Sequence, residues 1–224
     1  KRQTLYGVEL DRMSAKIAGY LYPEANIQNI GFERTNYPDG YFDVAIGNVP
    51  FGDYRVNDSV YNSHGFLIHD YFFAKTLDKL RAGGVAAYIT TKGTMDKEST
   101  KVREFLFKKA ELLGAIRLPN TAFKNAGTKV TADILFLQKR EREIENPEWT
   151  TITEDAQGFR INSYFVQHPE MILGTMQEIS GPYGMETTCV EKEGVPLGER
   201  LRAAISHITC LLYTSPSPRD RSVS

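Results

Sequence analysis

A short apolar run followed directly by Asn48-Val49-Pro50-Phe51 constrains the fold of this chain more than any other feature. The run, Phe42 to Gly47, is closed by Gly and followed by Pro and a further Gly, a pattern that continues neither a helix nor a strand ladder. We therefore predict a buried strand over 42–47. The tetrapeptide then lies at the carboxyl end of a strand, where open α/β sheets bind their ligands.

The tetrapeptide carries groups that suit an aromatic amine as a substrate. The lone pair of an exocyclic amine is conjugated into its ring, so the amine is a poor nucleophile unless acceptors are aimed at its N–H groups. The side-chain oxygen of Asn48 and the backbone carbonyl of Val49 can both accept, and Pro50 fixes the local φ so that they converge. Phe51 offers a flat face on which a base can stack. A base in a duplex must first be flipped out to reach such a site.

This tetrapeptide resembles the Asn-Pro-Pro-aromatic motif of S-adenosylmethionine-dependent amino methyltransferases, most closely that of the N6-adenine DNA methyltransferases. In this chain Val49 replaces the first Pro of the motif, and Phe51 replaces the commoner Tyr. The resemblance implies that Asn48, Val49, Pro50 and Phe51 form the catalytic motif, that S-adenosylmethionine is the cofactor and that DNA is the substrate. The reaction requires no metal, and the four histidines have no metal-ligand spacing.

Residues upstream of the motif are candidates for holding the cofactor. Leu5 to Asp11 indicates a strand that ends in an acidic residue, followed by a helix over 11–21 with Asp11 as its expected N-cap. The resemblance assigns Glu9 to the ribose hydroxyls of the cofactor and Leu10 to an apolar contact with its adenine. It also assigns Phe32 to the adenine, and packing in the core is the alternative for that ring.

Downstream of the motif, predicted helices and strands alternate. We expect helices over 64–80 and 98–110, and strands over 84–90, 112–118 and 130–138. This order predicts an α/β fold with a doubly wound, mostly parallel sheet. The resemblance implies the Rossmann-like S-adenosylmethionine methyltransferase fold, with the last strand antiparallel in a hairpin with its predecessor. It also makes Phe123, between these two strands, a second base-stacking aromatic, and a structural role is the alternative.

The two ends of the chain differ from the part between them. The first strand of the resembled family, with its Gly-rich cofactor turn, would precede Leu5, so the resemblance implies a methyltransferase domain over 4–140 that lacks this central strand and is inactive alone. Residues 1–3 and 210–224 resemble translated adapter sequence at the ends of metagenomic gene calls, and we expect both outside the fold. A natural disordered tail is the alternative for 210–224.

A second unit follows the charged run Lys139 to Glu143. Residues 141–209 indicate a small α+β extension that contains no catalytic constellation. Within it we expect Asn162 to be the N-cap of a helix over 163–167, and the alternation of 185–191 predicts a strand. The stretch 162–171 resembles the region that joins a methylase to a helicase domain in very large methylase-helicase proteins of conjugative plasmids and phages. The resemblance therefore implies a downstream helicase domain as a partner in a longer parent chain.

Composition and charge exclude several classes of protein. The formal net charge of −1 argues against a surface that binds phosphate throughout. Two cysteines cannot form a disulfide framework, and no apolar stretch reaches membrane-spanning length, so we expect a cytoplasmic protein of bacterial, phage or plasmid origin with no membrane partner. A local basic cluster, either a contact for a DNA backbone or a solvated helix face, consists of Lys92, Lys97, Lys101, Arg103, Lys108 and Lys109.

These patterns lead to one predicted function and two alternatives. We predict a site-specific, adenine-specific DNA methyltransferase of a restriction-modification or mobile-element system, which transfers a methyl group to the N6 amine of a flipped adenine. The same motif chemistry serves enzymes that methylate a protein glutamine or an RNA guanine, and Phe123 favours a DNA adenine over these. A non-catalytic DNA-binding module is the other alternative, against which the intact Asn48 to Phe51 run argues.

Overall fold

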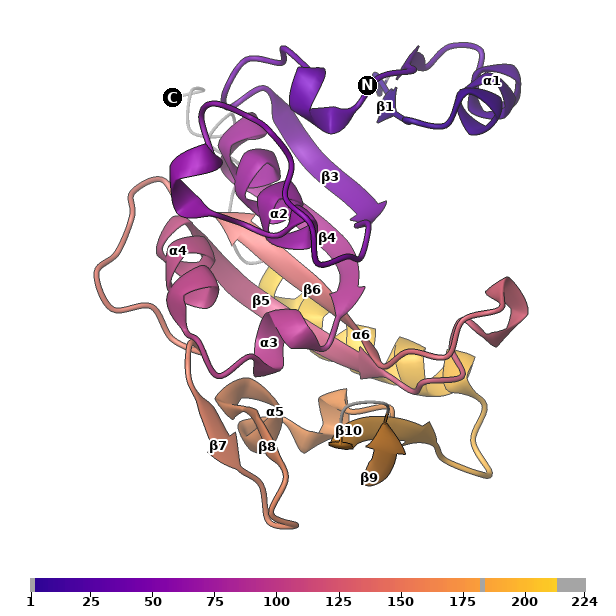
Figure 1. Cartoon of the computed structure of the whole chain (residues 1–224), viewed down its shortest axis with the longest axis vertical. Helices are drawn as coiled ribbons and strands as arrows, with labels where there is room; N and C mark the ends of the chain where they lie inside the picture. The colour runs from indigo at the N-terminus through magenta and orange to yellow at the C-terminus, as the bar shows by residue number, and fades with distance from the viewer. Residues whose placement is uncertain (1–2, 182–183, 213–224) are drawn as a thin grey trace.

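The computed structural model describes residues 3–181 and 184–212, in which a four-stranded sheet carries helices on both faces and three two-stranded sheets accompany it (Figure 1). The strand order of the main sheet is β3-β4-β6-β5. Of these four strands, β3, β4 and β5 point the same way and β6 runs against them. The predicted α/β fold with a mostly parallel sheet is confirmed, as is the antiparallel hairpin of the last strand. The strand bounds are β3 (Phe42–Asn48), β4 (Leu80–Thr91), β5 (Ala110–Leu118) and β6 (Ala132–Lys139).

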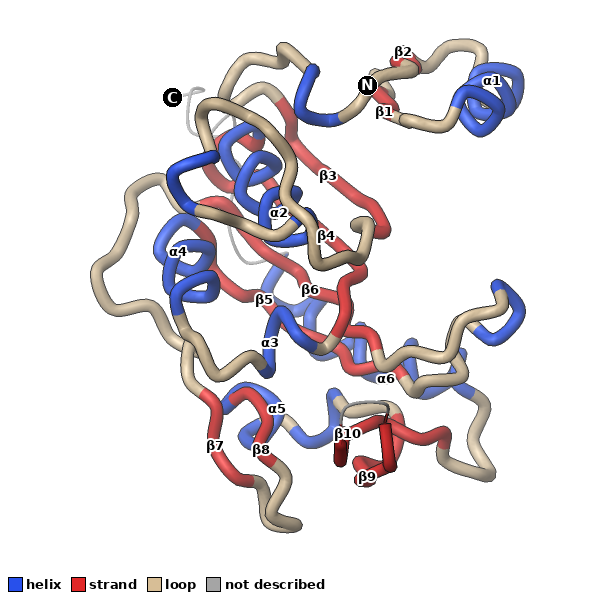
Figure 2. Tube along the Cα trace, viewed as in Figure 1, coloured by secondary structure: helices blue, strands red, loops and turns tan. Residues whose placement is uncertain are grey.

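Helices cover both faces of the main sheet (Figure 2). Helices α2 (Ile68–Lys79) and α4 (Lys101–Lys109) lie on one face, and α6 (Leu197–Leu212) lies on the other. Phe73 of α2 is fully buried, and burial of such a side chain contributes about 1.5–3 kcal/mol. Helix α6 packs against β5 at Gly114, where an added Cβ would lie 2.7 Å from Cγ1 of Ile208. A larger residue at position 114 would therefore require the Ile208 side chain to shift.

A separate two-stranded sheet precedes the main one. Strands β1 (Tyr6–Val8) and β2 (Asn26–Gln28) pair in parallel, and α1 (Arg12–Leu21) connects them. The predicted helix is confirmed, and the side chain of Asp11 caps it by accepting a hydrogen bond from the amide of Ser14 at 2.7 Å. Among the described residues no ladder joins this sheet to the main one. The two meet through aromatic rings, with Tyr6 edge-on to Phe42 at 5.3 Å between centroids.

Strand β3 is present where the sequence predicts it, but the expectation that it is buried is wrong. Val44 and Ile46 are 60% and 77% exposed. The reason is that β3 pairs only with β4 among the described strands, so its second edge and much of its surface face outward. Strands in parallel pairs are ordinarily covered on both faces, and the apolar sequence of β3 is typical of that setting.

The extension after residue 140 packs into the same apolar core as the main sheet. Asn162 caps α5 by accepting a hydrogen bond from the amide of Tyr164, as its position predicts. The predicted strand 185–191 is confirmed as part of β10. The extension consists of β7 (Ile152–Glu154), β8 (Arg160–Asn162), α5 (Ser163–Gln167), β9 (Gly174–Gly181), β10 (Gly184–Glu191) and α6. The residues that the extension contributes to the shared core include Ile161, Phe165, Met171, Leu173, Cys189 and Ile208.

The ends of the chain fall partly outside the described residues. Residues 1–2 lie in the predicted leader and 213–224 in the predicted tail, and both stretches are outside the description. Helix α6 extends as far as Leu212. None of the described helices combines the length and the apolar character that crossing a membrane requires.

Cys189 of β10 provides a test of how firmly the extension is packed. Its side chain is fully buried, and burial raises the pKa of the thiol to about 11. In a Cys210→Ser background we expect Cys189 to be unreactive toward a thiol reagent at pH 8 until the chain unfolds, because only the thiolate is nucleophilic. The measurement is the labelling rate at increasing urea concentration. Rapid stoichiometric labelling without denaturant would contradict the packing of β10 described above.

Candidate active site

The predicted catalytic motif begins at the last residue of β3 and continues beyond the carboxyl end of the strand. Val49 is buried, with 3% of its surface exposed, and its amide donates a 3.1 Å hydrogen bond to the carbonyl of Ile89 on β4. Asn48 is exposed, and among the described residues its side chain has no hydrogen-bond partner. Phe51 is 38% exposed. Val49 thus anchors the motif on the sheet and leaves the groups on either side of it available to a ligand.

The second predicted aromatic, Phe123, lies beyond the carboxyl end of β5. It is partly buried and packs against the core, so the structure gives it the alternative, structural role at least in part. Phe51 and Phe123 follow the two outer strands of the main sheet, which are three strand spacings apart. At about 4.8 Å per spacing, this is about 14 Å. Both rings can reach one base only if their loops lean toward each other.

The segment that carries Phe123 is attached to strand β10 of the extension. The amide of Asn120 donates a 2.7 Å hydrogen bond to the carbonyl of Cys189, and the Thr121 hydroxyl donates one of the same length to Glu191. The side-chain amide of Asn120 also donates to the Thr188 hydroxyl at 3.2 Å. Sequence reasoning did not predict these contacts, because they join residues about seventy positions apart.

The candidate cofactor residues lie at the carboxyl ends of β1 and β2. Glu9 is half-buried, and one of its carboxylate oxygens accepts a 2.8 Å hydrogen bond from the amide of Asp11. Asn29, which the sequence analysis missed, donates 2.9 Å hydrogen bonds to the carbonyls of both Glu9 and Leu10. Leu10 is 75% exposed. Within the described residues no hydrogen bond joins Glu9 or Leu10 to the motif at 48–51, so the structure does not bring the two sets together.

Phe32 lies in the short 3-10 helix η1 (Phe32–Arg34) that follows β2. Its ring packs against Phe72 of α2, with 4.9 Å between centroids, and Lys75 of the same helix lies above it at 5.2 Å. These contacts fit the alternative of a core role and leave the ring partly accessible.

Much of the predicted basic cluster is engaged within the protein. Arg103 is 1% exposed and donates to the carbonyls of Thr150 and Lys97, so it belongs neither to a DNA-binding surface nor to a solvated helix face. Lys92 donates to the Thr187 hydroxyl of β10, and burial lowers its pKa. Of the six cations, Lys97 and Lys101 remain exposed at the end of α3 (Gly93–Asp96) and the start of α4.

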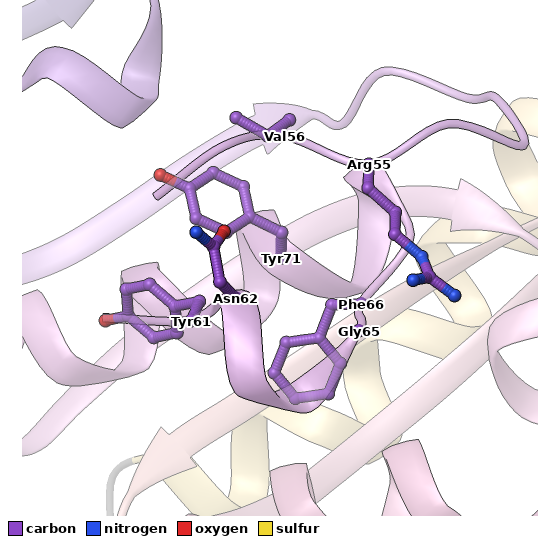
Figure 3. A pocket seen from close by; sticks show the side chains of 7 residues that line it. All are labelled: Arg55, Val56, Tyr61, Asn62, Gly65, Phe66 and Tyr71. Carbon is purple, nitrogen blue, oxygen red and sulfur yellow. The ribbon is translucent and has the colours of Figure 1, made fainter. Parts of the chain in front are cut away.

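A small pocket lies in the loop between the motif and α2 (Figure 3). None of the predicted catalytic residues lines it, so we do not identify it with the active site. The loop that forms this pocket includes the 3-10 turn η2 (Asn62–His64) and Gly65, whose φ of 64° is left-handed. The lining residues are Arg55, Val56, Tyr61, Asn62, Gly65, Phe66 and Tyr71.

A buried pair of ionisable residues lies at the start of α2, close to the same loop. The amide of Ile68 donates to the carbonyl of Tyr54, which fixes the beginning of the helix. His69 and Asp70 are 6% and 3% exposed, with 3.4 Å between the His69 Nε2 and the Asp70 Oδ1. The His69 Nδ1 is buried without a partner among the described residues. Burial lowers the pKa of His69 and raises the pKa of Asp70.

The lowered pKa of His69 predicts a pH-dependent stability. Below about pH 6.5, the ordinary pKa of histidine, the unfolded chain takes up a proton that folded His69 does not, so the free energy of unfolding should fall between pH 7.5 and 5.5. Asp70 acts in the opposite sense, because its folded pKa is raised. Urea denaturation at the two pH values measures the change.

His69→Gln should flatten this dependence, because it removes the group that titrates. The matched control is His207→Gln, which changes an exposed histidine of α6 and should keep the wild-type slope. A His69→Gln variant with the wild-type slope would show that another group is responsible.

Comparison with known proteins agrees with this architecture. The model of the family described as N-6 DNA Methylase matches residues 2–163. A curated relative, the Defense against restriction protein B of Escherichia phage P1, is 33% identical over 142 residues, which cover 61% of this chain and 6% of that protein.

Solved structures of methyltransferases share the fold. A putative class I S-adenosylmethionine-dependent methyltransferase from Listeria monocytogenes matches with a TM-score of 0.52 and 21% identity, covering 65% of this chain and 47% of that one. The M protein of the type I restriction enzyme EcoKI matches with a TM-score of 0.51 and 13% identity, covering 98% of this chain and 60% of that one. The chain thus spans 6% of the curated relative and 47% to 60% of these two structures.

Proposed function

The chain belongs to the N-6 DNA methylase family, and from this premise we propose that its parent protein methylates the N6 amine of adenine in DNA after base flipping. The observation that carries the proposal is the arrangement of the motif at the end of β3. Buried Val49 is hydrogen-bonded to β4 and holds exposed Asn48 and half-exposed Phe51 at the carboxyl edge of the sheet. The fold is that of S-adenosylmethionine-dependent methyltransferases, which implies this cofactor.

The residues at the end of β1 fit a bound nucleoside. Glu9 uses one carboxylate oxygen for the amide of Asp11, which leaves acceptor capacity for ribose hydroxyls. Asn29 fixes the backbone of Glu9 and Leu10 through two hydrogen bonds, so the turn is rigid before the ligand arrives. S-adenosylmethionine, when bound, would supply the methyl group.

In the proposed reaction the protein orients the target amine. The Asn48 side-chain oxygen and the Val49 carbonyl would accept hydrogen bonds from the two amine hydrogens, which weakens the conjugation of the nitrogen lone pair with the ring and leaves that lone pair available to the methyl donor. The methylated amine would then release one of its protons to solvent. Phe51 stacks on the face of the flipped base and replaces part of the stacking that the base loses in the duplex. Phe123 is the proposed second stacking residue, supplied by the loop that β10 attaches.

We also propose that residues 1–224 are inactive by themselves. Among the described residues the small sheet that carries Glu9 shares no ladder with the strand that carries Asn48. Glu9 is therefore placed relative to the catalytic motif only through side-chain contacts such as those of Tyr6 with Tyr41 and Phe42, without the strand that would join the two sheets. The resemblance of residues 162–171 to methylase-helicase proteins supports a helicase domain further along the parent chain as a partner.

A substrate comparison tests the proposed substrate against its rivals. The full open reading frame that encodes this sequence is incubated with labelled S-adenosylmethionine and, in separate reactions, unmethylated duplex DNA, a glutamine-containing protein substrate and ribosomal RNA. Label on DNA alone is the expected result. Label on the protein alone would assign a glutamine amide as the substrate in place of adenine, and label on the RNA alone would assign guanine. Absence of cofactor binding would favour a non-catalytic DNA-binding module.

A further inference from the structure

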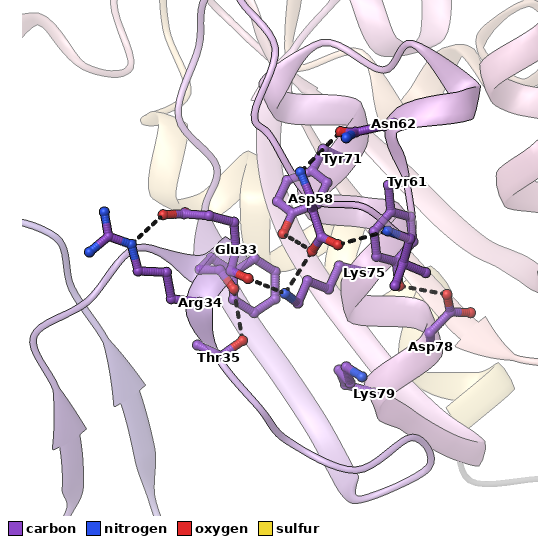
Figure 4. A network of polar contacts seen from close by, with 12 residues as sticks. Glu33, Arg34, Thr35, Asp58, Tyr61, Asn62, Tyr71, Lys75, Asp78 and Lys79 are labelled. Carbon is purple, nitrogen blue, oxygen red and sulfur yellow. Dashed lines mark hydrogen bonds and ion pairs between the residues drawn. The ribbon is translucent and has the colours of Figure 1, made fainter.

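We propose that Lys75 is a positioning residue that holds the turn carrying Phe32 and the loop after the catalytic motif in one fixed arrangement. What the two segments hold rests on the proposed function, together with the assignment of Phe32 to the cofactor adenine that the family resemblance implies: the adenine lies on one side and the flipped base on the other. The contacts that support the inference converge on Lys75 from segments that precede it by 17 and by 42 positions (Figure 4).

The first contact ties Lys75 to the loop between the motif and α2. The Lys75 Nζ lies 3.0 Å from the Oδ2 of Asp58, and the two side chains are 5% and 9% exposed. The hydroxyl of Tyr71, one turn earlier on α2, donates to the same oxygen at 2.8 Å. One carboxylate therefore connects the loop to two residues of the helix.

Asp58 in turn organises its own loop. Its Oδ1 accepts a hydrogen bond from the amide of Val60 at 3.1 Å, and its carbonyl accepts from the amides of Tyr61 and Asn62, both at 2.9 Å. The Asn62 side chain accepts a hydrogen bond from the amide of Asp58 at 3.0 Å. This loop begins directly after the motif, so its position limits where Phe51 can lie.

The second contact ties Lys75 to the Phe32 turn. The Lys75 Nζ donates to the carbonyl of Glu33 at 3.3 Å and lies above the Phe32 ring at 5.2 Å. A cation above a ring is attracted by its π electrons, more strongly when water is excluded. Lys75 therefore acts on the turn through both a hydrogen bond and a ring contact.

A role in positioning explains this buried charge better than a role in stability. Taking an ammonium group and a carboxylate out of water costs about as much as their attraction returns, and apolar residues of similar volume often stabilise a protein equally well. A charge with several directed partners does fix the geometry of those partners. Lys75 can satisfy its directed partners only if the loop and the Phe32 turn are both in place.

The same helix offers a matched control. Lys79, one turn after Lys75, pairs with Asp39 at 2.6 Å, but the side chain of Asp39 is 77% exposed. This pair joins α2 to a surface position and contacts neither the Phe32 turn nor the loop at 52–66 among the described residues.

Hydrogen exchange of the 224-residue chain tests the inference without any assay of activity. In Lys75→Met we expect exchange in both 52–66 and 31–35 to rise by about tenfold or more, since a hydrogen bond to a charged group can shift a local opening equilibrium by that factor. Exchange in strands β4 and β6 should stay as in wild type, and Lys79→Met should change neither segment. Unchanged exchange in either segment, or an equal rise throughout the chain, would overturn the inference.

A second variant covers the case in which a single charge left buried prevents folding. Asp58→Asn combined with Lys75→Met leaves no unpaired charge and should fold. The inference predicts that both segments still exchange faster in this double variant, and retained protection would overturn it.

The consequence for catalysis is measured separately, in the full open reading frame. Lys75→Met should raise the KM for S-adenosylmethionine and lower kcat together, whereas Lys79→Met should leave both as in wild type. A Lys75→Met enzyme with wild-type KM and kcat would overturn the catalytic role of the arrangement. If wild type binds no S-adenosylmethionine, the proposed function fails while the exchange result still decides whether Lys75 couples the two segments.

Discussion

Replacing Asn48 by Ala is expected to lower the rate of methyl transfer by about 100- to 1,000-fold, or about 3–4 kcal/mol of transition-state stabilisation, the effect of deleting one preorganised polar partner. Each hydrogen bond accepted from the amine makes its nitrogen more nucleophilic, and the substitution removes one of the two acceptors. Because the side chain is exposed and has no partner among the described residues, the fold should be unaffected. Single-turnover kinetics of the full open reading frame with saturating S-adenosylmethionine measure the rate.

The control for this prediction is Asn146→Ala, which removes an exposed asparagine in the segment after β6 and should keep the wild-type rate. The Asn48→Ala enzyme should also bind the cofactor as wild type does, since no contact joins Asn48 to Glu9 or Leu10. A wild-type rate in Asn48→Ala would remove this residue from the catalytic motif, and a loss of cofactor binding would assign the defect to another step.

Replacing Arg117 by Met should lower the free energy of unfolding by about 3–5 kcal/mol, the cost of leaving a buried charge without its partner. Arg117 and Asp133 are fully buried on neighbouring strands and form two parallel hydrogen bonds of 2.8 Å each. The Arg117 Nη1 also lies 2.8 Å from the Oδ2 of Asp96, with which it forms a further ion pair. Burial raises the pKa of Asp133 even with Arg117 beside it.

Urea denaturation of three variants tests the energetics of this pair. Arg117→Met leaves Asp133 without a partner, and Asp133→Asn leaves Arg117 with only Asp96. The double variant removes both charges and should be more stable than Arg117→Met alone, because no unpaired carboxylate then remains at position 133. Equal stability of wild type and Arg117→Met would show that the pair contributes nothing to the fold.

The sequence predicted regular structure well where a single segment determines it. Asp11 and Asn162 cap the helices that they were expected to cap. The helix expected over 64–80 begins instead at Ile68. Gly65 in the left-handed conformation ends a 3-10 turn there, and the chain must pass through an extended residue before α2 begins. Apolar periodicity alone does not reveal such a turn.

Burial and long-range polar contacts were less accessible to sequence reasoning. The apolar pattern of β3 predicted a buried strand, but burial depends on which neighbours a strand has, and β3 has one neighbour among the described strands. Arg103 resembles the surface cations around it in sequence, yet it donates to the carbonyl of Lys97 and to that of Thr150, which lies 47 positions later in the chain.

In the candidate site, too, local features could be predicted from the sequence and long-range contacts could not. Asn48 to Phe51 form a local motif, and the sequence identifies them because four adjacent residues carry the chemistry. Lys75 and Asp58 are separated by a loop that has little regular structure, so no periodicity links them. Asn29 was not predicted for the same reason, because it donates hydrogen bonds to the carbonyls of Glu9 and Leu10, which lie 20 and 19 positions earlier in the chain.

The most direct test of the central claim is the chemical identity of the methylated product. Duplex DNA is incubated with S-adenosylmethionine and the full open reading frame, digested to nucleosides and analysed by mass spectrometry. We predict N6-methyldeoxyadenosine with wild type and a strong loss of it with Asn48→Ala. Methylation of another base, or N6-methyldeoxyadenosine formed equally by the two proteins, would contradict the assignment of adenine methylation to the motif at the end of β3.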